Sequence, residues 1–579
     1  MEFVPEFGGE ETVVFMVIAR MLFAFFFEGL RFFIYEALAL VLLTAAAFLL
    51  EIVSKRRNFQ HPQSRPGAAS GIILGAITWP TVFAAHLLHC VRFVSNDETM
   101  LSGIKRVKGE FWVSIACSIR FLYVMARELL TKSAVKGTTY TTEGKVVAVD
   151  CTNLTLSNMK FVHGLALLLS FFTLSSSLSG LSGALVVTCG FFQVWGCDTL
   201  IYYIFSRFPA CATPGEGILV AEGLTLYAGN AAFYGISKVT LLFMSSQSSG
   251  LLEIGGDDID AVLQAILLAL LLVPSLYGVI NESMASQRQD SKVVDKDLTR
   301  LGDLYKALHF LIVLGFAMLV LAPWWLYLVR GLQQHLFLRI LDLVLDQPLQ
   351  RLTLCGYWVI VLGISLAHIY EVAKNGKTHR IIVRKYYHLV SVIMFVPALI
   401  FEPDFLRLAF GVALATFLVI EMIRALKIPP LGAIVHNFMK AFTDERDSDL
   451  LIVSHFSLLL GCAMPLWLNI SHNRRPLASF AGILSVGIGD TMASIVGLNF
   501  GSWRLTKYTK KTLEGTLAGI LSVIVACSLI IPFLPSGSFT VAQWSSLVFA
   551  TLCSGLVEAY TTQLDNLFVP LIFYALLCL

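Results

Sequence analysis

Long runs of apolar residues, separated by short polar connections, follow one another along almost the whole chain. Most runs approach or exceed the roughly 20 residues that an α-helix needs to cross a bilayer. In hydrocarbon only helices and closed barrels satisfy their own backbone hydrogen bonds, and these runs are far too long for barrel strands. The pattern predicts an all-α, polytopic integral membrane helix bundle with roughly 15 (13 to 17) transmembrane helices.

The first run, 13–27, is predicted to stay in the mature protein. Arg20 interrupts it, and it has neither a basic leading region nor a convincing cleavage site, so it does not resemble a removed signal peptide. The later runs expected to be helical are 32–53, 71–94, 111–130, 161–178, 181–205, 217–244, 261–280, 307–329, 352–370, 389–401, 405–423, 451–468, 480–498, 515–534, 541–559 and 567–579.

The polar connections predict an organisation in two parts. One long polar stretch, 282–306, carries charges of both signs and is interpreted as a seam between an N-terminal helix array, 1–306, and a C-terminal region, 307–579, that carries the motifs below. The loops 371–385 and 499–511 are strongly basic, and Lys and Arg collect on the cytoplasmic side. Counting crossings puts both loops on that face and puts 469–477 on the lumenal face.

Composition supports the membrane assignment and excludes other classes. The 579 residues are 56% hydrophobic and 14% charged, with a mean hydropathy of +0.75. A soluble protein would be nearer ~25% charged. The net charge of +3 is too balanced for nucleic-acid binding. The 11 cysteines include no CxxC pair, so neither a disulfide framework nor a zinc site is predicted.

One predicted span contains an acid among small residues. In the segment SVGIGDTMASIVG, Asp490 is surrounded by apolar and small side chains. An ionisable group at membrane depth costs ~3 kcal/mol on insertion scales and points to a functional site. Gly487, Gly489 and Gly497 would let a phosphate or another backbone approach closely. The alternative is that the small residues pack helices together and that Asp490 bonds to a neighbouring group.

A basic segment, WRLTKYTKKTLEGTLAG, follows directly. Lys507, Lys510 and Lys511 can neutralise phosphate charge, while Thr512 can cap a helix whose first amides favour an anion. Glu514 stands at the entrance to the next span. Alone, such a loop is typical of a positive-inside anchor. After the acidic span it supplies what phosphoryl transfer needs, which is carboxylates for Mg²⁺ and cations for the phosphates.

Three more polar stretches fall on the same predicted face. VRKYYH presents Arg384, Lys385 and His388 at the mouth of a span, where a basic anchor is an equally good interpretation. The loop FTDERDSDLL is acidic and favours a solvated surface. EAYTTQLDN presents Glu558 and Asp565 at the facing ends of two spans. No GxxxxGK[ST] motif and no soluble protein-kinase motif set is present.

Five segments follow one another in this order: RKYYH, the acidic loop leading to LIVSHFSLLLGCAMPLWL, GDTMASIVG, TKKTLEGT and EAYTTQLDN. Together they resemble the polyprenol kinase family of CTP-dependent lipid kinases. An ordered series of motifs over roughly the last 200 residues is more specific than any single one. Relatives acting on phytol or diacylglycerol consist of little more than this core, so the additional spans favour a member that acts on dolichol. The N-terminal half matches no motif.

The resemblance implies transfer of the γ-phosphate of CTP to the terminal hydroxyl of dolichol at the endoplasmic reticulum membrane. The product, dolichyl phosphate, would supply N-glycosylation, GPI anchor synthesis and mannosylation. The implied partners are CTP, dolichol within the bilayer and membrane lipids, with no nucleic acid, and the oligomeric state is left open. Because dolichol cannot leave the bilayer and CTP is cytosolic, the site is expected at the cytoplasmic face.

The chemistry of the individual residues suggests a role for each in such a reaction. Asp490 is expected to bind Mg²⁺ or to orient the acceptor hydroxyl, and Glu514 or Asp565 would complete the metal shell. Lys511 is expected to act on the phosphates, and His388 is the candidate proton acceptor. The nucleotide site is assigned to Gly487, Gly489, Asp490, Thr491, Ser494, Gly497, Lys507, Lys510, Lys511 and Thr512.

Two alternatives stay open. A transporter or channel would use an intramembrane acid and broken helices as an ion site, with matching breaks in two halves. No counterpart of GDTMASIVG occurs before Lys306. A CTP-dependent kinase of another lipid alcohol, phytol or diacylglycerol, is the second alternative, because no residue of the sequence identifies the isoprenoid-binding surface.

Overall fold

The computed structural model describes residues 8–59, 61, 63–92, 98–137, 181–243, 258–287, 296–330, 335–374, 380–440, 452–469, 475–505, 511–534 and 539–579. These residues are almost entirely helical, and their one β-type pairing is an isolated bridge between Arg504 and Thr512. The predicted run 161–178 lies outside the described residues.

Many helices are long and apolar enough to cross a membrane, which confirms the predicted polytopic helix bundle. Within the described residues eight candidate spans meet both criteria, and three shorter apolar helices accompany them. The eight are Phe33–Arg56, Ile72–Arg92, Asp258–Val279, Gly302–Val329, Pro348–His368, Pro403–Ala425, Pro476–Phe500 and Leu513–Phe533.

The chain forms two compact units, and the first is discontinuous in sequence. The first unit joins Met1–Phe233 to Ser471–Leu579, and the second contains Tyr234–Ile470. The predicted seam at 282–306 therefore lies inside the second unit. The C-terminal region, 307–579, is divided between both units, while the functional roles predicted for the two halves stay predictions.

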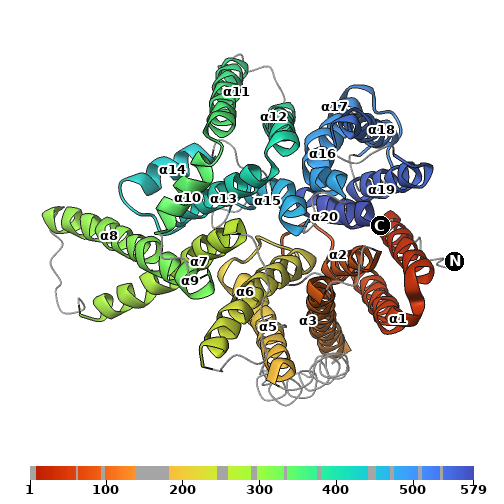
Figure 1. The fold of residues 1–579 in the computed structure, drawn as a ribbon, viewed down its shortest axis with the longest axis horizontal. Helices are drawn as coiled ribbons and strands as arrows, with labels where there is room; N and C mark the ends of the chain where they lie inside the picture. The colour runs from red at the N-terminus through yellow and green to blue at the C-terminus, as the bar shows by residue number, and fades with distance from the viewer. Residues whose placement is uncertain are drawn as a thin grey trace, which may run out of the picture. The chain divides into compact units, whose positions relative to one another are not determined.

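The N-terminal part of the first unit contains α1 (Gly9–Arg56), α2 (Ile72–Arg92), α3 (Glu98–Gly137), α5 (Leu181–Arg207) and most of α6 (Pro214–Phe243), which crosses the unit boundary after Phe233. Helix α1 has two arms that lie side by side (Figure 1). The rings of Phe15 and Phe48 meet at 5.0 Å between centroids, and Lys55 forms an ion pair with Glu11.

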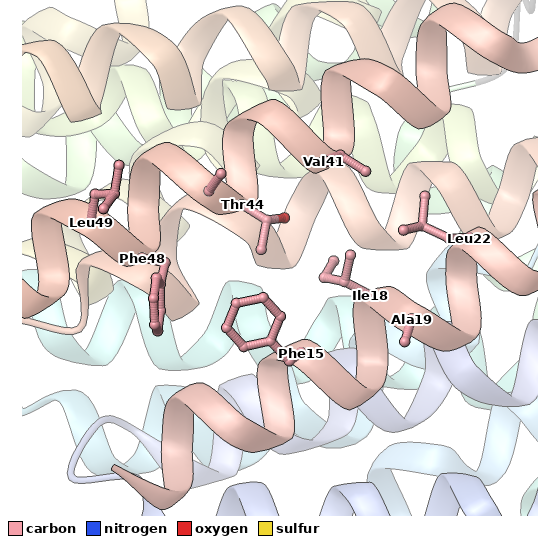
Figure 2. Close-up of a pocket in the computed structure, with 9 residues that line it drawn as sticks. Phe15, Ile18, Ala19, Leu22, Val41, Thr44, Phe48 and Leu49 are labelled. Carbon is pink, nitrogen blue, oxygen red and sulfur yellow. The ribbon is translucent and has the colours of Figure 1, made fainter. Parts of the chain in front are cut away.

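An apolar groove of about 350 Å³ lies between the two arms of α1 (Figure 2). Phe15 and Phe48, one from each arm, line it together, and Thr44 contributes the one hydroxyl of its lining. That hydroxyl donates to the main-chain oxygen of Leu40 at 2.7 Å. The groove therefore suits hydrocarbon and offers no acid or base for chemistry.

The N-terminal helices contain buried charges that are paired. Lys108 lies 2.9 Å from Glu36, whose carboxylate also accepts a hydrogen bond from the indole of Trp112 at 3.1 Å. Arg120 and Asp198 form a second ion pair at 3.0 Å. Charges in a transmembrane bundle normally face its interior and pair with one another, so these contacts hold α1 to α3 and α3 to α5.

The C-terminal part of the first unit carries the predicted motifs. One continuous helical span comprises η3 (Pro476–Phe480), α16 (Ala481–Leu484), η4 (Ser485–Asp490) and α17 (Thr491–Phe500). It is followed by α18 (Leu513–Ile530), η5 (Ile531–Phe533), α19 (Val541–Tyr560) and α20 (Asp565–Cys578). Helix α19 begins with a capping box formed by Thr540 and Gln543.

The two parts of the first unit pack together closely. Helix α2 contacts α20, and α1 contacts α19. The buried His86 ring nitrogen lies 2.6 Å from the hydroxyl of Tyr574. A side chain at Gly9 would collide with the ring of Tyr560. The motif-bearing helices are therefore built onto the N-terminal helices.

Besides the C-terminal end of α6, the described part of the second unit contains nine α-helices and one π-helical turn. They are α7 (Asp258–Gln287), α8 (Lys296–Phe316), η2 (Ala317–Leu321), α9 (Ala322–Arg330), α10 (Leu336–Leu345), α11 (Pro348–Lys374), α12 (Arg380–Phe401), α13 (Pro403–Ala425), α14 (Leu431–Lys440) and α15 (Val453–Leu468). Its core gathers around α7. Helices α10 and α14 occupy stretches that the hydropathy pattern left as connections.

Candidate active site

Asp490 is the last residue of the π-helical turn η4, in the middle of the span 476–500. Single π-helical turns inside α-helices are frequently found at functional sites. Asp490 is 7% exposed, and its side chain does not cap the following helix α17. The structure thus places a buried carboxylate where the helical geometry changes, within the segment predicted to bind the nucleotide.

The small residues around Asp490 bring two backbones together. A Cβ atom added to Gly515 of α18 would lie 2.5 Å from the main-chain oxygen of Ala493 and 3.0 Å from the Cα of Gly497. One added to Gly519 would lie 2.9 Å from the oxygen of Gly489. Helix packing therefore accounts for Gly489 and Gly497, as the alternative interpretation proposed. Their nucleotide-binding role stays a prediction.

The other predicted residues of this span differ in accessibility. Gly487 and Thr491 are buried, whereas Ser494 is half-buried. A direct contact with a nucleotide is thus easier for Ser494 than for Gly487 or Thr491.

The loop between α17 and α18 is closed by its own main chain. The amide of Leu513 donates to the oxygen of Trp503 at 2.8 Å, and the amide of Leu505 donates to the oxygen of Lys511 at 3.2 Å. The Thr512 hydroxyl accepts a hydrogen bond from the amide of Gly515 at 3.3 Å, which confirms the predicted cap of α18. Lys507 and Lys510 lie outside the described residues.

Glu514 holds the start of this loop. One of its carboxylate oxygens accepts hydrogen bonds from the amides of Ser502 and Trp503, at 3.0 and 3.1 Å. Within the described part of the chain, no three His, Cys, Asp or Glu side chains are placed to hold one metal ion. The carboxylate of Glu514 faces the loop amides, and the metal-binding roles of Asp490, Glu514 and Asp565 stay predictions.

Lys511 connects two of the predicted motifs. Its ammonium nitrogen lies 3.8 Å from a carboxylate oxygen of Asp565, the first residue of α20. It also donates a hydrogen bond to the main-chain oxygen of Glu558, near the end of α19. Both Lys511 and Asp565 side chains are partly exposed. A cation and a carboxylate from TKKTLEGT and EAYTTQLDN thus meet at one accessible point.

The span that carries Asp490 runs alongside α20 in the opposite direction. The first turn of this span lies beside the last turn of α20, as the small pocket lined by both Leu477 and Leu577 shows. The π-helical turn η4 also packs against α18, α19 and α20. Since both helices advance by similar amounts per residue, Asp490 lies toward the end of α20 that carries Asp565 and its partner Lys511.

His388 belongs to the second unit, on α12. It is 5% exposed, and its main-chain oxygen accepts a hydrogen bond from the Ser391 hydroxyl at 2.6 Å. Asp490 and Lys511 belong to the first unit. The role of His388 as a proton acceptor stays a prediction, and the acidic loop 441–450 lies outside the described residues.

Sequence reasoning did not single out Thr562 and Gln563, although both lie in EAYTTQLDN. They contact residues of the N-terminal half, and Gln563 is completely buried. The one available signal was the T-x-x-E pattern of Thr213 and Glu216, which is typical of a helix start. No local pattern marked Gln563 as the partner of that helix start.

Comparisons with known proteins point in one direction. The sequence model described as dolichol kinase matches residues 134–523. The Arabidopsis thaliana protein named dolichol kinase EVAN is 39% identical over 583 residues, which cover 99% of this chain and 98% of that protein. Human dolichol kinase is 33% identical over 384 residues, or 64% of this chain and 65% of that protein. No solved structure matches.

Proposed function

Because the chain belongs to the dolichol kinase family, we propose that it transfers the γ-phosphate of CTP to the terminal hydroxyl of dolichol. The observation that carries the proposal is the contact of Lys511 with Asp565 and with the oxygen of Glu558. This contact joins the basic loop before α18, which is suited to phosphate, to the end of α19 at Glu558 and to the start of α20 at Asp565. Asp490 lies toward this same end of α20.

In the proposed reaction the hydroxyl oxygen of dolichol forms a bond to the γ-phosphorus. The bond between that phosphorus and the β–γ bridging oxygen breaks, and CDP leaves with the electron pair. Such transfers pass through a loose transition state, so catalysis depends on positioning and on charge stabilisation. We assign the phosphates to Lys511, with Lys510 and Lys507 in support, and the hydroxyl proton to His388.

Asp490 has two proposed roles, which are orienting the acceptor hydroxyl and holding Mg²⁺. Mg²⁺ is usually held by one or two carboxylates together with substrate phosphates, so a three-carboxylate shell is not required. Asp490 and Asp565 fit this pattern better than Glu514, whose carboxylate accepts two loop amides. A bound Mg²⁺ ion would neutralise part of the phosphate charge.

We further place the reaction at the endoplasmic reticulum membrane, with the site on its cytoplasmic face. Several candidate membrane spans fit a lipid acceptor that stays in the bilayer. The product, dolichyl phosphate, would supply N-glycosylation, GPI anchor synthesis and mannosylation. Membership of a kinase family favours an enzyme over the transporter alternative.

The proposal is tested with purified full-length protein in lipid nanodiscs. Labelled CTP or labelled ATP is supplied with dolichol, phytol or diacylglycerol, and the labelled lipid is identified. We expect dolichyl phosphate from CTP and dolichol, with the other pairs far slower. Labelling of another alcohol in preference to dolichol, or from ATP in preference to CTP, would contradict the proposal.

The same assay tests Asp490. Asp490→Asn keeps the shape of the side chain and removes its charge, so turnover should fall by ~10² or more at normal expression. Activity within a few fold of the parent would remove Asp490 from the site while leaving the substrate assignment intact.

A further inference from the structure

The loop between α19 and α20, residues 561–564, is attached to a segment of the N-terminal half. We call residues 63–71 the anchor segment. The amide of Ala69 donates to the Thr562 hydroxyl at 3.1 Å, and the Gln563 side-chain amide donates to the oxygen of Ala69 at 3.0 Å. Arg65 donates to the main-chain oxygen of Thr562 at 3.2 Å. Residues almost 500 positions apart in sequence thus meet.

Gln563 is held at both ends of its side chain. It is completely buried, and the Thr213 hydroxyl donates to its carbonyl oxygen while its amide nitrogen donates to Ala69. A buried amide that loses one of these partners is left with an unsatisfied polar group. Its position is therefore fixed jointly by the anchor segment and by the start of α6.

A buried ion pair fixes the anchor segment itself. The guanidinium of Arg65 lies 2.6 Å from Glu216, and the two side chains are 7% and 1% exposed. Glu216 also accepts a hydrogen bond from the amide of Thr213 at 2.9 Å, at the start of α6. The same terminal nitrogen of Arg65 donates to Glu216 and to the main-chain oxygen of Thr562. Because charged hydrogen bonds in a buried place are short and directional, the ion pair fixes the orientation in which Arg65 meets Thr562.

The loop 561–564 connects the two groups that Lys511 contacts. Glu558 lies three residues before the loop, and Asp565 follows it directly. A displacement of the loop therefore changes the geometry of both contacts of Lys511. In phosphoryl transfer, which depends mainly on positioning, a shift of about 1 Å can cost roughly 10² in rate.

We propose that the anchor segment positions the α19–α20 loop for phosphoryl transfer, with Gln563 as the positioning residue. This inference rests on the proposed function and gives part of the N-terminal half a role in it. The role is indirect, since Gln563 acts through the placement of Asp565, of the Glu558 oxygen and hence of Lys511.

Two glycines of the anchor segment provide a matched test. Gly71 has φ +64° and Gly67 has φ +77°, so alanine strains the backbone at both positions. A Cβ at Gly71 would lie 2.4 Å from the Gln563 side chain, whereas a Cβ at Gly67 meets nothing within 4 Å. Gly71→Ala therefore displaces Gln563, and Gly67→Ala is the control for backbone strain.

A second pair of variants, with smaller structural changes, keeps the test valid if Gly71→Ala fails to fold. Thr562→Val keeps the shape of the side chain and removes the acceptor for the Ala69 amide, while Thr562→Ser keeps the acceptor. Each protein is studied at full length in lipid nanodiscs. Amide hydrogen exchange of 561–566 reports the order of the loop, and steady-state kinetics report kcat and the KM for CTP.

We expect Gly71→Ala and Thr562→Val to increase exchange in 561–566 and to lower kcat/KM for CTP at least about tenfold. Gly67→Ala and Thr562→Ser should stay within about twofold of the parent. Equal losses in both glycine variants, or increased exchange with unchanged kcat/KM, would overturn the proposal. If the parent protein phosphorylates no dolichol, the proposed function fails. Amide hydrogen exchange tests the positioning role separately: unchanged exchange of 561–566 in Gly71→Ala would overturn it.

Discussion

Lys511 is predicted to bind phosphate, and the structure places it in contact with Asp565 and with the main-chain oxygen of Glu558. Replacing it with Gln removes a cation that can hold phosphate but leaves the lipid-facing surface intact. We therefore expect Lys511→Gln to raise the KM for CTP by about tenfold, and to raise the KM for dolichol much less. Steady-state kinetics with each substrate varied in turn measure both values.

The control for this variant is Lys306→Gln, because Lys306 is an exposed lysine in the middle of helix α8, in the second unit. It lies outside the candidate site and should behave like the parent. An unchanged CTP response in Lys511→Gln would return Lys511 to the role of a topology anchor, which its basic loop also suggests.

At the scale of residues, the sequence predicted local contacts better than distant ones. The cap of α18 by Thr512 was predicted because the donor lies only three positions away. The bonds of Gln563 to Ala69 and Thr213 were not predicted, since their partners are 494 and 350 positions away. Nothing in the sequence around Gln563 distinguishes a buried amide from an exposed one.

At the scale of helices, the contact between α17 and α18 is a backbone contact. A side chain at Gly515 would press against the main-chain oxygen of Ala493 at 2.5 Å, and a main-chain atom cannot rotate away. We expect Gly515→Ala to separate the two helices and to lower the free energy of unfolding by roughly 1–3 kcal/mol. Thermal unfolding in detergent, followed by circular dichroism, measures the change.

Gly356→Ala is the matched control, because Gly356 lies within helix α11 and a Cβ there meets nothing within 4 Å. This variant should be neutral or more stable, since alanine favours a helix over glycine by about 1 kcal/mol. If the two variants are equally stable, the main chain of α17 does not set the distance at which α18 packs against it.

Helices were predicted according to how their apolar residues are distributed. A long run such as 515–534 is apolar on every side and corresponds to α18. Helices α10 and α14 are short and apolar along one face only, so a search for long apolar runs passes over them. The π-helical turn at Asp490 was not predicted, because it has no hydropathy signature.

At the scale of the whole molecule, the counting of crossings predicts the sidedness of the site. Single cysteines placed at Ser502 and at His472 in a cysteine-depleted chain report it in sealed microsomes. An impermeant reagent should label position 502 from outside and position 472 only after permeabilisation. Ser502 is exposed, while His472 lies outside the described residues, so the second position rests on the counting of crossings alone.

The reverse labelling pattern, or labelling of both positions without permeabilisation, would break the counting of crossings and remove the predicted access of Asp490 and Lys511 to cytosolic CTP. The sequon at Asn281 provides an independent check. Counting back two crossings, 352–370 and 307–329, from the cytoplasmic loop 371–385 puts it on the same face. Asn281 should therefore carry no glycan, which a glycosidase-dependent mobility shift would detect.

The division of the molecule into units could not be predicted from the sequence. The polar stretch 282–306 looked like a boundary, whereas the compact units divide near residues 233 and 470. A linker is recognised by its composition, but the first unit is defined by contacts between distant segments, such as Arg65 with Thr562 and His86 with Tyr574. Such contacts leave no periodic signal.

The discontinuity of the first unit has a consequence during synthesis. A ribosome adding ~5–20 residues per second needs tens of seconds to produce the segment that separates the two parts of this unit. Throughout that interval Arg65, Thr213 and His86 are made, but their partners Thr562, Gln563 and Tyr574 are not. The newly inserted N-terminal helices must wait in the membrane with polar groups unsatisfied, which exposes them to membrane chaperones and quality control until α19 and α20 arrive.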